Sequence, residues 1–251
     1  MIRSFLAAVQ FLTRIPVNLA APVAHERVVP WFPTVGALIG LAVGTVAAAA
    51  VLLVGVSTAA TLAVIVGLLI TGAFHEDGLA DTADAFGGGW STKQRLEILK
   101  DSRHGTYGVA AMVSTILLRV VTLAALETGA LMLAAAVAAH TIGRMAAVLA
   151  LGMFPPAVDS GLGAETTRDF NPALAAVGLA AGLTIAALAI GWWTLPAVLA
   201  ALVAMLAVGL LAARKIGGIA GDVLGAIEQV AEGAVLITIV GLARRWNLWW
   251  A

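Results

Sequence analysis

The 251 residues include no cysteine, which excludes disulfides, cysteine metal sites and thiol catalysis. Charge is also scarce: 11% of the residues are Asp, Glu, Lys or Arg, against about 25% in a typical soluble domain. The formal net charge is zero, so no overall basic field indicates nucleic-acid binding, and we expect none. The composition is instead 61% hydrophobic. It predicts a protein embedded in the lipid bilayer.

Six apolar segments approach the roughly 20 residues that a helix needs to cross a membrane. A seventh, Ala234–Ala243, is short; it is either the end of a helix that starts near Gly221 or an interfacial segment, which Arg244-Arg245-Trp-Asn-Leu-Trp-Trp250 favours. We predict an all-α, polytopic integral membrane protein with six to seven transmembrane helices and short interfacial helices, forming one domain over residues 1–251. The six segments are Thr34–Val54, Thr58–Phe74, Tyr107–Leu126, Ala130–Leu151, Ala173–Ile190 and Leu195–Ala213.

Lys and Arg are confined to alternate connections between these segments. Gly55–Ser57, Glu127–Gly129 and Gly191–Thr194 contain neither residue. The positive-inside rule therefore predicts a cytoplasmic-membrane (inner-membrane) protein with its N-terminus and the segment 75–108 on the cytoplasmic side. The cations on that side are Arg3, Arg14, Arg27, Lys93, Arg95, Lys100, Arg103, Arg168, Arg214 and Lys215.

Six of the 14 acidic residues lie between positions 76 and 101. Asp77, Asp81 and Asp84 are spaced i, i+4 and i+7, so on a helix that continues from the second span they share one face. Such carboxylates repel one another and require a cation near a membrane. Oxygen ligands favour Mg²⁺ or Mn²⁺, with Mg²⁺ leaving positions for water and a phosphate ester. The sequence thus predicts a metal site on these three residues; the alternative is a solvated helix face.

Cations follow the acidic segment. Ser91–Lys100 is predicted to be a short helix, and Lys100 and Arg103 stand before a glycine-containing entry to the third span. Lysine and arginine next to a helix N-terminus are suited to hold phosphate. On its own, this cluster would equally well be a positively charged membrane flank.

Isolated charges elsewhere are open to two interpretations. Asp222 is either a site residue or a helix cap, and Arg14 either reaches the site or only sets topology. Arg144 lies inside a predicted span and needs an anionic partner. Arg119 is expected to snorkel or to pair with Glu127.

Four strings in the same order closely resemble the cobalamin synthase family, the adenosylcobinamide-GDP ribazoletransferases. The strings around Asp-Gly-Leu-Ala-Asp-Thr-Ala-Asp and Lys-Asp-Ser-Arg are highly specific. Glu76 stands where the family commonly has Leu, and His104 where an aliphatic residue is frequent. The four strings are Phe11–Val17, His75–Asp84, Leu96–Gly108 and Gly221–Ala226.

The resemblance implies the last assembly step of coenzyme B12. α-Ribazole or its 5′-phosphate attacks the phosphorus attached to cobinamide in adenosylcobinamide-GDP and expels GMP. It also implies Mg²⁺ on Asp77, Asp81 and Asp84, with Lys100 and Arg103 on the diphosphate. The base is an aspartate of this trio, Asp101 or His104. Substrate binding is expected at Arg14, Arg103, Tyr107, Arg144 and Asp222. A homo-oligomer is compatible with all of this.

Two other functions compete with this interpretation. A CDP-alcohol phosphotransferase also uses aspartates and a metal in the membrane, but Asp81 and the Asp-x-x-Asp spacing depart from its motif. An ion-coupled transporter places charges near the membrane midplane and is built from repeats. The sequence shows no repeat, and its charges concentrate on one side.

Overall fold

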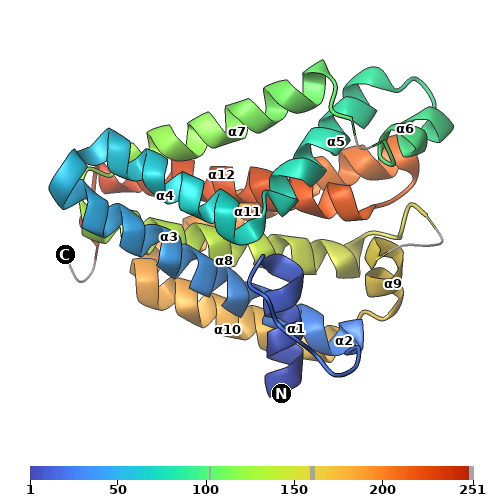
Figure 1. The fold of residues 1–251 in the computed structure, drawn as a ribbon, viewed down its shortest axis with the longest axis horizontal. Coiled ribbons are helices and arrows are strands. Elements are labelled where there is room, and N and C mark those ends of the chain that lie inside the picture. The colour runs from blue at the N-terminus through green and yellow to red at the C-terminus, as the bar shows by residue number, and fades with distance from the viewer. Residues whose placement is uncertain (102, 159–161, 249–251) are drawn as a thin grey trace.

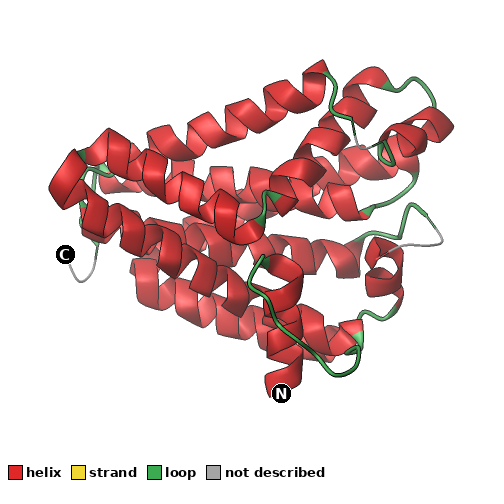
Figure 2. Ribbon diagram, in the orientation of Figure 1, coloured by secondary structure: helices red, strands yellow, loops and turns green. Residues whose placement is uncertain are grey.

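The computed structural model describes residues 1–101, 103–158 and 162–248, so the predicted interfacial Trp249 and Trp250 lie outside the described residues. Within those ranges the chain forms helices and loops and no β-strand (Figure 2), which confirms the all-α prediction. The α-helices are α1 (Ile2–Leu12), α2 (His25–Val28), α3 (Phe32–Val54), α4 (Val56–Thr71), α5 (Phe74–Gly88), α6 (Thr92–Ile98), α7 (Thr106–Ala124), α8 (Gly129–Met153), α9 (Leu162–Arg168), α10 (Pro172–Ile190), α11 (Thr194–Ile216) and α12 (Gly221–Ala243).

Five helical stretches in the described chain are long and apolar enough to cross a membrane, or six if the bent pair α4–α5 counts as one span. The polytopic prediction is therefore confirmed. One of the five, Pro172–Ile216, comprises both α10 and α11. A straight helix of that length would be about 68 Å long, more than twice the hydrocarbon thickness. The chain instead reverses at Gly191–Trp193, so α10 begins and α11 ends at the same end of the bundle (Figure 1).

The connections separate into two sets. The loops around α6, the helix α9 and the α11–α12 loop lie at one end, whereas the turns after α3, α7 and α10 lie at the other (Figure 1). The cation-rich connections thus share one end of the molecule, as their alternation along the sequence predicted.

The centre of the bundle is α8, which is buried along most of its length and packs tightly against α3. Gly36, Gly40 and Gly44 of α3 form a stripe at four-residue spacing that faces it. A Cβ on Gly40 would lie 2.7 Å from the Cα of Val137, and one on Gly44 would lie 2.6 Å from the Cα of Leu133. Small residues at this spacing let two membrane helices pack backbone to backbone.

The acidic helix is not a continuation of the second span, so that part of the prediction was wrong. The axes of α4 and α5 differ by 88°. Gly72 and Ala73 both have left-handed backbone angles, with φ of 67° and 57°, and this conformation ends an α-helix. After the bend, α5 lies against α12: a Cβ on Gly78 would be 2.8 Å from the carbonyl oxygen of Asp222.

The seventh apolar segment is the second half of a long helix. α12 begins at Gly221 and includes Ala234–Ala243, which decides between the two alternatives that the sequence left open. The first half was obscured because Glu228, Gln229 and Glu232 interrupt the apolar pattern. All three side chains are buried.

Replacing Gly40 by Val should loosen the α3–α8 contact, because the added carbons would overlap the α8 backbone. Overpacking of this kind costs about 1–3 kcal/mol. Thermal unfolding in detergent should show a lower midpoint for Gly40→Val than for Gly241→Ala, whose Cβ would meet no atom within 4 Å. Equal midpoints would contradict the close contact.

Candidate active site

A cavity of about 320 Å³ opens at the cation-rich end of the bundle. One part of its wall is apolar and aromatic, from Phe11, Phe32 and Phe74. Polar groups from several helices line the rest, including Asp77, Lys100, Arg144 and Asp222. Such a cavity suits a ligand that has both a large apolar body and charged groups.

Asp77 and Asp81 lie one turn apart on α5, and both face His104 from the loop before α7. Asp77 Oδ1 is 3.3 Å from His104 Nε2, and Asp81 Oδ1 is 3.3 Å from His104 Nδ1. Potential ligand atoms of the three residues all lie within 4.8 Å of one another. The Asp77 side chain is 60% exposed and that of Asp81 13%, so the cluster has a buried and a solvent-facing side.

Asp84, one turn further along α5, has a different set of partners. Its carboxylate accepts hydrogen bonds from the backbone N–H of Gly105 at 2.6 Å and of Gly108 at 2.9 Å. A Cβ on Gly105 would lie 2.6 Å from Asp84 Oδ1, which explains the glycine there. Asp84 therefore fixes the loop that carries His104 and the N-terminus of α7, where a negative charge is stabilising.

The predicted phosphate clamp divides into two parts. Lys100 lines the cavity. Arg103 is 86% exposed and binds Asp101 through both carboxylate oxygens, at 3.0 and 2.7 Å. These hydrogen bonds lower the pKa of Asp101 to about 2. Ser102, between them, lies outside the described residues.

The remaining sequence-predicted residues occupy three positions. Arg14 lines a second hollow together with Asp77 and His104, next to the α4–α5 bend. Asp222, at the start of α12, shares the main cavity with Asp77. Tyr107 is 58% exposed, and a Cβ on Gly87 would lie 2.8 Å from its ring. Neither Tyr107 nor Arg103 lines these two hollows.

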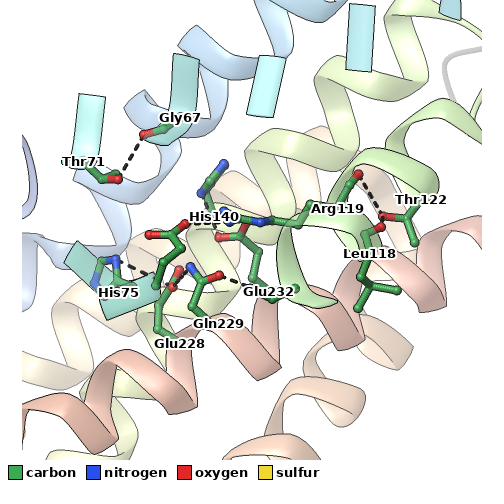
Figure 3. Close-up of polar contacts among 12 residues, drawn as sticks. Gly67, Thr71, His75, Leu118, Arg119, Thr122, His140, Glu228, Gln229 and Glu232 are labelled. Atoms are coloured by element: carbon green, nitrogen blue, oxygen red, sulfur yellow. Dashed lines mark hydrogen bonds and ion pairs between the residues drawn. The ribbon is translucent and has the colours of Figure 1, made fainter. Parts of the chain in front are cut away.

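A buried cluster of charges lies behind the cavity, inside the helix bundle (Figure 3). Arg119 of α7 contacts Glu76 at 2.7 Å and Glu232 at 3.7 Å. The expectation that it would snorkel or pair with Glu127 is wrong, because its side chain is only 6% exposed and turned inward. A guanidinium within the bundle requires carboxylates within reach.

Arg144 of α8 forms the other half of this cluster. It contacts Glu228 and, at 3.0 Å, Glu232 of α12. His140 Nδ1 is 2.9 Å from Glu232. Gln229 donates to Glu228 at 2.9 Å.

Three carboxylates thus face two guanidiniums, which leaves one negative charge if both imidazoles of the cluster are neutral. Uncompensated charge inside a protein costs several kcal/mol. One further proton on a glutamate or on His140 would balance these charges. His140, Glu228 and Glu232 also have the geometry of a metal site. However, these glutamates already form ion pairs with the two arginines, which supply the positive charge that a metal ion would bring.

Comparisons with known proteins give the family. The family model described as cobalamin-5-phosphate synthase matches residues 4–240. The chain belongs to the cobalamin-5-phosphate synthase family. Relatives named adenosylcobinamide-GDP ribazoletransferase include those of Azorhizobium caulinodans, 40% identical with 95% of each chain covered, and Bradyrhizobium diazoefficiens, 39% identical with 92% of this chain and 90% of the relative covered. The relative from Shewanella frigidimarina is 34% identical, with 95% of this chain and 94% of the relative covered. No solved structure matches the chain.

In this member of the cobalamin-5-phosphate synthase family, sequence reasoning missed the buried ion pairs of Glu228 and Glu232. The available signal was the i, i+4 spacing of two glutamates next to an apolar run. Two arginines inside other apolar segments were the complementary signal. Together they indicate buried ion pairs between spans.

Replacing Arg119 by Met should leave Glu76 without its guanidinium and Glu232 with that of Arg144 alone. Removing one partner of a buried ion pair typically costs about 3–5 kcal/mol. The unfolding midpoint of Arg119→Met in detergent should therefore fall well below that of wild type. Glu127→Gln, which tests the discarded pairing, should unfold like wild type; the reverse result would refute the assignment.

Proposed function

We propose that this chain catalyses the final step of adenosylcobalamin synthesis, as an adenosylcobinamide-GDP ribazoletransferase. The observation that carries the proposal is the cluster of Asp77, Asp81 and His104 beside a cavity with both apolar and charged walls. A bulky corrinoid with a nucleoside diphosphate attached has this mixed character. Family membership selects this reaction among those that such a site supports.

The donor set of the cluster fits Mg²⁺. Two carboxylates on successive turns are the number of protein ligands that Mg²⁺ typically uses, and the exposed side leaves room for water and phosphate. Asp77 and Asp81 are the residues that would hold it. Bound there, Mg²⁺ would neutralise the charge that develops on the phosphoryl oxygens. Asp84, which the sequence grouped with these ligands, anchors the His104 loop through its two amide contacts.

The chain's cations position the diphosphate. Lys100 shares the main cavity with Asp77, and Arg14 shares the second hollow with it. Displacement at phosphorus depends mainly on alignment and charge stabilisation, which these side chains supply. Arg103, held by Asp101 at the rim, is the outer cation of this set.

Other polar groups bind the two substrates. Asp222 lines the cavity, where its carboxylate can accept hydrogen bonds from hydroxyl or amide groups. Tyr107 lines neither hollow, and its exposed ring remains available to a substrate that extends beyond the cavity. Arg144 lies at the inner end of the cavity. The hydroxyl oxygen of α-ribazole, or of its 5′-phosphate, bonds to phosphorus as the bond to GMP breaks. Its proton passes to a carboxylate of the Asp77–Asp81 pair or to His104.

The membrane orientation follows from charge. The cation-rich end, which carries the cavity, faces the cytoplasm under the positive-inside rule. Arg244 and Arg245, which follow α12 at the opposite end of the bundle, are exceptions to this distribution of cations. α-Ribazole then reaches the site directly from the cytoplasm, and the large amphiphilic adenosylcobinamide-GDP meets it at the membrane surface.

Purified protein in detergent should release GMP from adenosylcobinamide-GDP and α-ribazole when Mg²⁺ is present and not after EDTA treatment. Asp81→Asn should lower kcat about 100-fold or more, the size expected for losing a preorganised electrostatic group. Glu97→Gln, an exposed carboxylate next to Lys93, is the matched control and should retain activity. CMP release from a CDP-alcohol would favour the phosphotransferase alternative, and activity only in sealed vesicles would favour transport.

The absence of native cysteine makes the orientation directly testable. A single cysteine at Lys93, whose side chain is 88% exposed, should react with a membrane-impermeant maleimide in inside-out vesicles only. A cysteine at Glu127, in the turn after α7, should react in right-side-out vesicles only. The opposite pattern would invert the proposed orientation.

A further inference from the structure

His75 connects the cavity with the buried charge cluster. It is the second residue of α5, and its side chain lines the same cavity as Asp77. Figure 3 shows it at the end of the cluster opposite Arg119. Its Nδ1 lies 3.4 Å from Nη2 of Arg144 and 3.7 Å from Oε2 of Glu228.

The contact with Arg144 favours one of the two ring nitrogens of His75 as the site of the proton. A guanidinium only donates hydrogen bonds, so the nitrogen that faces Arg144 must accept. Glu228 is beyond hydrogen-bond distance and does not compete for a proton at Nδ1. The neutral imidazole therefore carries its hydrogen on Nε2.

Nε2 is free to serve a ligand. None of the hydrogen bonds and ion pairs within residues 1–101, 103–158 and 162–248 involves it. Nε of the neighbouring Arg144 is fully enclosed and has no partner. Nε2 of His75 is not among the enclosed atoms of this kind, which is consistent with contact with the cavity. Because the side chain borders the cavity, its N–H is available there.

We propose that His75 donates its Nε2–H to a phosphoryl oxygen of adenosylcobinamide-GDP, with Arg144 as the positioning residue that fixes its tautomer. The inference rests on the proposed function, because it concerns the substrate of that reaction. Arg144 polarises the ring, so a buried positive charge acts on the phosphate through a neutral imidazole. The donor is held by the packed α5–α8–α12 contact and needs no reorganisation during the reaction.

In this arrangement His75 neither gains nor loses a proton. The hydroxyl oxygen of α-ribazole bonds to phosphorus, and the bond between this phosphorus and GMP breaks. The hydroxyl proton passes to the Asp77–Asp81–His104 cluster. A second proton on His75 would stand directly beside the Arg144 guanidinium. Glu228 faces His75 from α12, and His140, Glu232 and Arg119 lie behind it. A change in the charge of any of these groups would act on His75, so the test includes a pH profile.

The first test compares two substitutions of His75. Gln places an N–H donor near the position of Nε2, whereas Leu has none. We expect His75→Gln to keep kcat within about tenfold of wild type with an unchanged pH–rate profile, and His75→Leu to lose about 100-fold or more. His25→Gln, a partly exposed histidine on α2, is the control and should behave like wild type.

Two results would overturn the proposal. If folded His75→Gln and His75→Leu are equally impaired and both lose the acidic limb of the pH profile, His75 is a base. If His75→Leu is fully active, His75 has no role in the reaction. Absence of GMP release by wild type would instead refute the proposed function.

A second test needs no active variant. Phe74–His75 is the only Phe-His pair in the sequence, so ¹³C′-Phe and ¹⁵N-His labels assign its NMR signals in the wild-type protein. The ring should show a protonated Nε2 and an unprotonated Nδ1 from about pH 6 to 8. A protonated Nδ1 would refute the assignment.

The role of Arg144 is tested by the double variant Arg144→Gln/Glu228→Gln. It removes one positive and one negative charge and so keeps the net charge of the cluster. Without the guanidinium, part of the His75 signal should shift to the Nδ1–H tautomer. An unchanged tautomer in this folded variant would show that Arg144 does not set it. If the variant does not fold, the wild-type tautomer decides the proposal.

Discussion

The contacts of two arginines with three glutamates join four helices inside the bundle. Arg119 comes from α7 and Arg144 from α8, while the glutamates come from α5 and α12. In an environment poor in water, each charge depends on the others, so these helices are held in one relative arrangement. Apolar contacts between membrane helices are far less directional, because lipid is as apolar as leucine. The position of α5 therefore depends on this cluster.

That position matters because α5 has two functional sides. His75 and Glu76, at its start, face the buried charges, and Asp77, Asp81 and Asp84 face the loop before α7. Neighbouring residues in the chain thus serve the interior and the site. The sharp turn after α4 makes this possible, since a straight continuation would have carried the acids away from α12.

Much of this was predictable from sequence. The six apolar segments gave six of the long helices to within a few residues, because length and hydropathy determine them, whereas only the second half of α12 was apparent. The acid spacing correctly placed Asp77 and Asp81 on one face of α5. The bend was not predictable, because a non-glycine residue, Ala73, takes a left-handed conformation there. The acidic partners of Arg119 and Arg144 are more than 40 residues away in sequence, so only the packing of helices reveals them.

The glycine stripe between α3 and α8 has a mechanical consequence. Two helices whose backbones touch cannot slide or separate without losing that contact, so this pair acts as a rigid frame, and α8 carries Arg144 on it. The cavity wall, by contrast, includes residues of α1, α6 and α9, which are short. A substrate as large as a corrinoid would therefore displace these outer helices as it enters, while the frame keeps the reacting groups in register.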